Sequence, residues 1–130
     1  MKKALLALSV LMLPLLALPA TAEARNWVRL GERVVGHQVD KETFQLSHSG
    51  TFKALSFRVY NNDLRILRFQ VKFANGERVD VNVGRVIPAG GTSGYIDLPG
   101  HRRHIRRVHI WYKTVGHRGP PARVQLYGRH

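Results

Sequence analysis

The sequence contains no cysteine, and this absence removes several kinds of chemistry at once. Disulfide bonds, thiol catalysis, cysteine-ligated metals and a lipid-modified N-terminal cysteine are all excluded. A small domain without disulfides must be stabilised by the packing of its core. The stability of this chain therefore depends on its apolar residues.

Acidic residues are scarce, since the chain has 8 Asp and Glu against 21 Lys and Arg. Hydrolytic catalysis needs a nucleophile with a base, or two carboxylates, in one pocket. No serine lies in a G-x-S-x-G setting, and Gly90–Gly94 lacks the lysine and following helix of a phosphate loop. We expect a protein that is not an enzyme. A hydrolase, the remaining catalytic alternative, would require a polar pocket holding two of the acidic residues beyond Glu23: Glu32, Asp40, Glu42, Asp63, Glu77, Asp80 and Asp97.

Metal ligands are not arranged to converge, although the chain has 7 histidines. His101, His104 and His109 follow no helical spacing, and no carboxylate follows Asp97 closely enough in the sequence to support them. Neighbouring arginines would also repel a cation. We therefore predict no metal site and no cofactor.

The first residues have the pattern of a secretory signal peptide. Lys2 and Lys3 provide the positive charge, Ala4 to Leu18 the apolar stretch, and Ala22-Glu23-Ala24 a small-x-small cleavage site. An uncleaved membrane anchor is the alternative, but Pro14, Pro19 and a second overlapping cleavage pattern disfavour it. The sequence predicts cleavage after Ala22 or Ala24 and export to the periplasm or the extracellular space.

The remaining residues, 25–130, have the length of one domain and the pattern of an all-β protein. Short runs rich in Val, Ile, Phe and Tyr alternate with polar residues and are separated by turn-forming residues. The spacing favours an antiparallel two-sheet β-sandwich of about eight strands, either a jelly roll or an immunoglobulin-like arrangement. The expected strands are 27–35, 43–47, 53–60, 65–73, 78–83, 94–98, 106–114 and 123–128.

One hairpin can be predicted in register. Leu67, Phe69, Val71 and Phe73 should share one face because side chains alternate along a strand. A two-residue loop would set this apolar face against that of the next strand, whereas a three-residue loop, 74–76, aligns the two. We therefore expect Gly76 in a left-handed conformation and the cross-strand pairs Phe73 with Glu77, Val71 with Val79, and Phe69 with Val81. The opposite face then holds Arg68, Gln70 and Lys72 opposite Asn82, Asp80 and Arg78.

Basic residues are densest in His101–Arg107, and they continue on the outward side of the strand that follows. If the last strand pairs with that strand, the outward side chains of both form one surface of cations and aromatic rings. Such a surface suits phosphate, carboxylate or headgroup ligands, because arginine binds anions through two hydrogen bonds and rings stack. Alternatively, a loop or the N-terminal strand covers Trp111 and the charges only contact solvent. The candidate partner-binding residues are Arg102, Arg103, Arg107, His109, Trp111, Lys113, Arg123, Tyr127 and Arg129.

Several short motifs along the chain resemble those of a group of small exported bacterial β-sandwich proteins of unknown function. They include Phe73-Ala74-Asn75-Gly76, Ile96-Asp97-Leu98-Pro99-Gly100 and Val124-Gln125-Leu126-Tyr127-Gly128. These are turn and core residues, so the resemblance implies a fold and a compartment but transfers no active site.

The formal net charge of the whole chain is +13, and removing Lys2, Lys3 and Glu23 leaves +12. Such a charge attracts anionic partners, although a preference for arginine codons would also produce it. We expect a binding module that contacts lipopolysaccharide, phospholipid headgroups, an acidic glycan or an acidic protein, peripherally to any membrane. Nucleic acid is not the expected partner. The alternative is an accessory subunit of a cell-envelope assembly, and the oligomeric state stays open.

Overall fold

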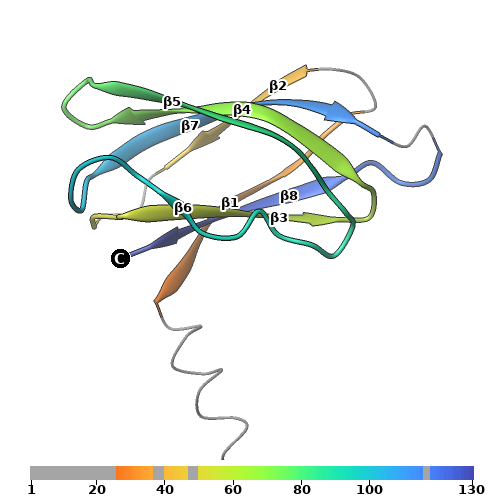
Figure 1. Cartoon of the computed structure of the whole chain (residues 1–130), viewed down its shortest axis with the longest axis horizontal. Helices are drawn as coiled ribbons and strands as arrows, with labels where there is room; N and C mark the ends of the chain where they lie inside the picture. Colours follow the sequence, from red (N-terminus) through yellow and green to blue (C-terminus); the bar gives the residue numbers. More distant parts are fainter. Residues whose placement is uncertain (1–25, 37–39, 47–49, 116–117) are drawn as a thin grey trace, which may run out of the picture.

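The computed structural model describes residues 26–36, 40–46, 50–115 and 118–130, and over these residues the protein consists of β-strands and loops without a helix. Eight strands form two antiparallel four-stranded sheets that pack face to face (Figure 1). We call the sheet with the order β1-β8-β3-β6 sheet A and the sheet with the order β2-β7-β4-β5 sheet B. The strands are β1 (Trp27–Val34), β2 (Asp40–Gln45), β3 (Ala54–Tyr60), β4 (Leu64–Phe73), β5 (Arg78–Ile87), β6 (Ile96–Asp97), β7 (Ile105–Thr114) and β8 (Arg123–Arg129).

The expected strands are present, with differences mainly in length. Strand β6 is limited to two residues, since Gly94 has a positive φ of 77° just before it and Pro99 follows. Strand β5 extends past the expected end at Val83, because Gly84, with a φ of 62°, forms a bulge after which pairing with β4 resumes. The predicted end of the second strand at Ser47 lies outside the described residues, as do the predicted signal peptide and its cleavage sites.

The predicted hairpin register is confirmed. Phe69 pairs with Val81 and Val71 with Val79, while the Phe73 amide donates to the Glu77 carbonyl over 2.9 Å. Gly76 has a φ of 94°, as the three-residue loop requires. The placement of Leu67 is wrong in detail: it occupies a register shift between Ile66 and Arg68, so that Ile66 takes the fully buried position.

The last two long strands do not pair with each other. The chain crosses between the sheets after β7, and β8 inserts between β1 and β3 in sheet A, whereas β7 lies between β2 and β4 in sheet B (Figure 1). This interleaved order is that of a double-sheet jelly roll. The expectation that the outward faces of β7 and β8 form one surface is therefore wrong, because the two strands present those faces on opposite sides of the sandwich.

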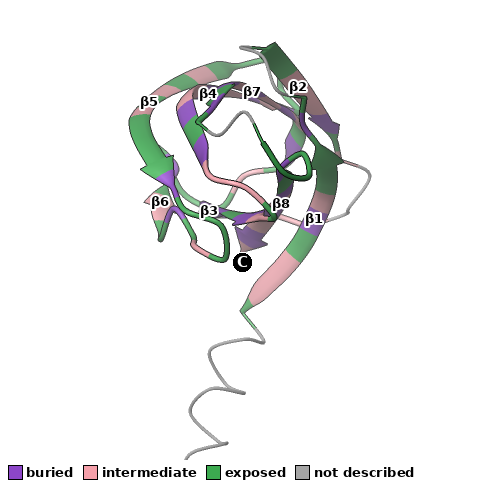
Figure 2. Ribbon diagram, turned by 90° about the vertical axis from the view of Figure 1, so that its right-hand side faces the viewer, coloured by how far each residue is buried: buried purple, intermediate pink, exposed green. Residues whose placement is uncertain are grey.

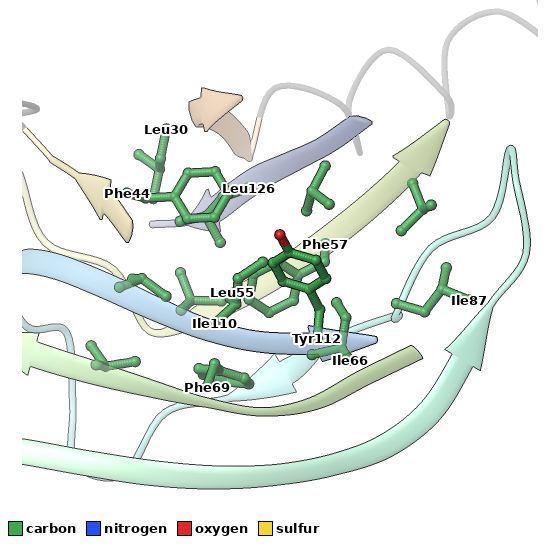
Figure 3. Close-up of a cluster of buried hydrophobic side chains, with 14 of the residues drawn as sticks. Leu30, Phe44, Leu55, Phe57, Ile66, Phe69, Ile87, Ile110, Tyr112 and Leu126 are labelled. Carbon is green, nitrogen blue, oxygen red and sulfur yellow. The ribbon is translucent and has the colours of Figure 1, made fainter. Parts of the chain in front are cut away.

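The core lies between the sheets and contains buried residues from all the long strands. Figure 2 shows buried positions on strands of both sheets. Phe57 from sheet A and Phe69 from sheet B meet at its centre, with ring centroids 5.2 Å apart and planes at 64° (Figure 3). Of the residues predicted to share the inward face of β4, Phe69, Val71 and Phe73 are buried and Leu67 is half-buried. Alternation along each strand thus leaves polar side chains on the two outer faces.

Two glycines allow the sheets to close at the β1 edge. A Cβ at Gly31 would lie 2.9 Å from the Phe44 ring, and a Cβ at Gly128 would lie 2.8 Å from both Leu30 and Phe52. Gly128 is in β8 and Gly31 is at the register shift of β1, so both positions need a residue without a side chain.

Candidate anion-binding face

The outer face of sheet B carries rows of polar side chains that run across its four strands. One row is Lys41, Trp111, Arg68 and Asn82, and the next is Thr43, His109, Gln70 and Asp80. A third row is Gln45, Arg107, Lys72 and Arg78, and Lys113 lies opposite Arg65 beyond the first. We name this surface the basic face, defined by its seven cations: Lys41, Arg65, Arg68, Lys72, Arg78, Arg107 and Lys113.

Arg107, Lys72 and Arg78 stand side by side on adjacent strands, with no carboxylate between them. Neighbouring strands are about 4.8 Å apart, so the three positive charges repel one another. Arg107 and then Arg78 lower the pKa of Lys72 below its ordinary value. An anion bound at this row would reduce the repulsion between the three charges.

The side chain of Arg107 also has an unfavourable environment. Its Nε is buried and has no hydrogen-bond partner among the described residues. A buried donor without a partner destabilises a fold, because the donor loses its contact with water and gains nothing in return.

Among the described residues, Trp111 lies beneath two cations of the basic face, Arg68 and Lys41. The Arg68 guanidinium stacks 3.5 Å from the centroid of the indole ring, and the Lys41 ammonium lies 5.3 Å from it. Asp80, the only carboxylate that the register places on this face within the described strands, pairs with Arg68 at 3.1 Å and orients it. The indole and the salt bridge thus fix Arg68 in the plane of the surface.

His109 adds a titratable group to the middle row. Its Nδ1 and the Thr43 hydroxyl are 2.8 Å apart in a hydrogen bond. Burial lowers the pKa of His109 below its ordinary value, and the charges of Lys41 and Arg107 lower it further. His109 is therefore neutral at pH 7, and protonation in acid would add one more positive charge to the face.

The nine residues predicted from the sequence fall into three separate places. Arg107, His109, Trp111 and Lys113 lie on the basic face; Arg123, Tyr127 and Arg129 lie on the outer face of sheet A; Arg102 and Arg103 lie in the connection from β6 to β7. They do not form one surface.

Arg103 has a structural role that the sequence did not reveal. Its guanidinium forms an ion pair with Glu77 at 3.0 Å and lies 3.8 Å from the Phe73 ring centroid. Its backbone forms two hydrogen bonds with Phe52, at 2.9 and 3.0 Å. Arg103 therefore connects the β4–β5 turn to the segment at Phe52 and stabilises this end of the core.

Five cations of the basic face were missing from the predicted site: Lys41, Arg65, Arg68, Lys72 and Arg78. The hairpin prediction had already placed three of them on an outward surface. The missing information was that β7 pairs with β4 instead of β8, which joins the hairpin to the Trp111 strand.

The described residues contain neither a cluster of metal ligands nor a membrane-spanning helix. Within them, no group of three or more His, Asp or Glu side chains lies close enough to hold a metal ion. No helix suited to crossing a bilayer occurs in the same part of the chain.

Comparisons with known proteins give a family but no activity. No curated protein matches the sequence. Among solved structures, the crystal structure of the SPBc2 prophage-derived protein YomS is similar with a TM-score of 0.39 and 12% identity, over 80% of this chain and 91% of that one. A family model described as a domain of unknown function, DUF2541, matches residues 5–128. Since this match spans nearly the whole sequence, the chain belongs to the DUF2541 family.

Proposed function

We propose that the protein is a non-catalytic binding module that uses the basic face to hold an anionic component of the cell envelope or of the extracellular space. The observation that carries the proposal is the row Arg107, Lys72 and Arg78, three adjacent cations without a carboxylate among them. The three charges repel one another, whereas a ligand with several negative charges would be attracted to all three at once.

The shape of the face favours an extended anion over a single ion. Three cations on adjacent strands span about 10 Å, at the strand spacing of about 4.8 Å. The row therefore suits a chain or layer of anionic groups, such as lipopolysaccharide, phospholipid headgroups or an acidic glycan. Trp111 and Arg68, packed together two rows away on the same face, provide a rigid surface on which such a ligand can rest.

The test compares charge loss on the two sides of the sandwich. The variant Lys72→Gln/Arg78→Gln removes two charges from the basic face, and Arg29→Gln/Arg123→Gln removes two from sheet A. Binding to lipopolysaccharide and to vesicles with and without phosphatidylglycerol is measured over a salt series. We expect the first variant to reduce the slope of log affinity against log salt by about two, one for each lost contact, and the second to leave it unchanged.

Equal losses in both variants would contradict the proposal, because binding would then follow net charge alone. A protein that instead co-purifies with an envelope assembly through a contact resistant to salt would support the alternative, an accessory subunit. The structure gives this alternative no specific support. The edge strand β5 carries a bulge at Gly84 and charged residues, which are features that discourage pairing with another sheet.

Export is part of the same proposal, and it rests on the sequence of residues 1–24. Expressed in a bacterium, the protein is expected outside the inner membrane with its N-terminus at Glu23 or Arg25. Cell fractionation and the intact mass of the purified protein measure this directly. A mass that includes Met1 to Ala22 in the exported fraction would contradict cleavage.

A further inference from the structure

The outer face of sheet A contains a hollow of about 360 Å³, on the opposite side of the sandwich from the basic face. Its size lies within the range of small-molecule sites, about 300 to 1,000 Å³. Aromatic rings form its walls, and hydroxyl groups contribute to its polar lining. We name it the aromatic hollow, after its principal lining residues Trp27, Tyr95, Tyr127, Ser56, Thr92 and Arg58.

The hollow is held in shape by backbone pairing. The segment 90–93 runs along β3, where the Gly90 amide donates to the Val59 carbonyl over 2.7 Å and the Ser93 amide donates to the Phe57 carbonyl over 2.8 Å. The buried Ser93 hydroxyl accepts a hydrogen bond from the Phe57 amide. This pairing fixes the segment that leads to Tyr95, whose ring meets Trp27 of β1. The walls are therefore formed before any ligand binds.

Trp27 and Tyr95 form a corner. Their ring centroids are 6.0 Å apart and their planes meet at 83°. The Arg129 guanidinium, which does not line the hollow, lies 5.9 Å from the Trp27 centroid and 5.6 Å from the Tyr95 centroid and supports both rings. A planar nucleobase cannot stack on both of these rings at once, because the rings are nearly perpendicular. A sugar ring in the chair form carries C–H groups on its face and on its rim, so it can contact both rings.

The polar lining offers hydrogen bonds to sugar hydroxyls. The Gln125 amide donates to the Glu32 carboxylate over 2.8 Å, which leaves its oxygen to accept from the Tyr127 hydroxyl at 2.7 Å. The Tyr127 oxygen is thus free to accept from a ligand. Ser56 and Thr92 share a hydrogen bond of 3.0 Å, and Thr92 also accepts from the Gly94 amide, so the pair retains capacity for a ligand hydroxyl.

Arg58 gives the hollow its charge. It is exposed at the lining, its guanidinium carbon lies 5.9 Å from the Tyr127 ring centroid, and among the described residues it forms no ion pair. The acidic side chain in the same row, Glu32, lies two strands away and is occupied by Gln125 and Arg123. An anionic group on the ligand therefore has a ready partner in Arg58.

We propose that the aromatic hollow binds one pyranose ring of a uronic-acid-containing saccharide, independently of the basic face. The ring packs into the corner of Trp27 and Tyr95, its hydroxyls contact Ser56 and Tyr127, and its carboxylate pairs with Arg58. Because the aromatic hollow lies on sheet A and the basic face on sheet B, a saccharide bound in the hollow leaves the basic face free for a different anion.

The two tryptophans of the chain make the test specific, because Trp27 lies in the aromatic hollow and Trp111 on the basic face. The variant Trp111→Phe therefore reports only on the hollow, and Trp27→Phe only on the basic face. The probes are trigalacturonic acid and its methyl ester, which keeps the sugar ring but loses the charge. Titrations are followed by fluorescence in 150 mM salt, a condition that weakens contacts depending on charge alone.

We expect trigalacturonic acid to change the fluorescence of Trp111→Phe in a saturable way, and the methyl ester to bind about tenfold or more weakly, since its charge-assisted hydrogen bond is lost. Adding Arg58→Gln to that variant should abolish the preference for the acid. Adding Tyr95→Ala should weaken both ligands, and this half-exposed residue can be replaced without opening the core.

Three results would overturn the proposal. The first is a saturable change in the fluorescence of Trp27→Phe with no change in that of Trp111→Phe, which would assign the saccharide to the basic face. The second is equal affinity for the acid and the ester in the chain that retains Arg58. The third is a stronger response of Trp111→Phe to a nucleoside monophosphate than to either saccharide. If the saccharide binds the hollow, while vesicles and lipopolysaccharide fail to bind and trigalacturonic acid leaves the fluorescence of Trp27→Phe unchanged, the function proposed for the basic face is refuted and this inference stays intact.

Discussion

Arg107 provides the most discriminating test of the basic face, because replacing it should change stability and binding in opposite directions. Arg107→Met keeps an unbranched apolar stem that fills the same space, and it removes both the positive charge and the buried Nε. A residue that contributes to binding although it destabilises the fold should show this combination of higher stability and weaker binding when it is replaced.

The expected gain in stability follows from the unpartnered donor. A buried N–H without a partner destabilises by about 1 to 3 kcal/mol, and repulsion with Lys72 acts in the same direction. We expect Arg107→Met to raise the free energy of unfolding by about 1 to 2 kcal/mol, and Tm by about 5 °C or more. Urea denaturation and thermal unfolding measure both quantities.

Lys113→Met is the matched control, since it removes one charge from the same strand at an exposed position. Its effect on stability should stay within about 0.5 kcal/mol. Both variants should bind lipopolysaccharide more weakly, with the larger loss for Arg107→Met, which lies in the three-cation row. If Arg107→Met instead destabilises the protein, the prediction is wrong. The arginine would then stabilise the fold by more than its unpartnered Nε destabilises it.

Three further predictions concern pH and the core. Folding lowers the pKa of His109, so the unfolded chain takes up the proton first and the free energy of unfolding should decline as pH falls below about 6.5. His109→Gln, which keeps a neutral partner for Thr43, should show a shallower decline in urea titrations between pH 7 and 5. Identical curves for the two proteins would show that other groups cause the decline. Phe69→Ala should lower the free energy of unfolding by about 3 to 5 kcal/mol, because the side chain is fully buried against Phe57, and a loss below 1 kcal/mol would place it at the rim. Gly128→Ala should destabilise by about 1 to 3 kcal/mol through overpacking, measured by the same unfolding curves, and an unchanged Tm would mean that the two side chains facing Gly128 move aside freely.

The strands and the hairpin register could be predicted because they depend on local patterns. Alternation of apolar residues identified the inward side chains, and the turn at 74–76 fixed the pairing of Val71 with Val79. The shift at Leu67 could not be predicted in this way, because it depends on how β4 matches the strands on either side of it.

Only part of the candidate site was predicted, because its composition depends on which strands pair. Trp111 and Arg107 were correctly placed facing outward, but their neighbours come from β4, residues 64–73, and from β2. The contacts that bring these strands together are made by buried residues such as Phe44, Phe69 and Ile110, whose apolar character is common to every strand. Nothing in their pattern specifies one partner over another.

Strand β8 occupies the middle of sheet A although it lies at the end of the described chain. Both of its neighbours, β1 and β3, belong to the first part of the domain and do not pair with each other. Sheet A therefore cannot assemble from the N-terminal residues as they emerge during synthesis. Pairings between distant segments make folding slow, since the chain must close long loops before it gains contacts. Until residues 123–129 are available, β1 has no partner within its sheet, and sheet A stays incomplete.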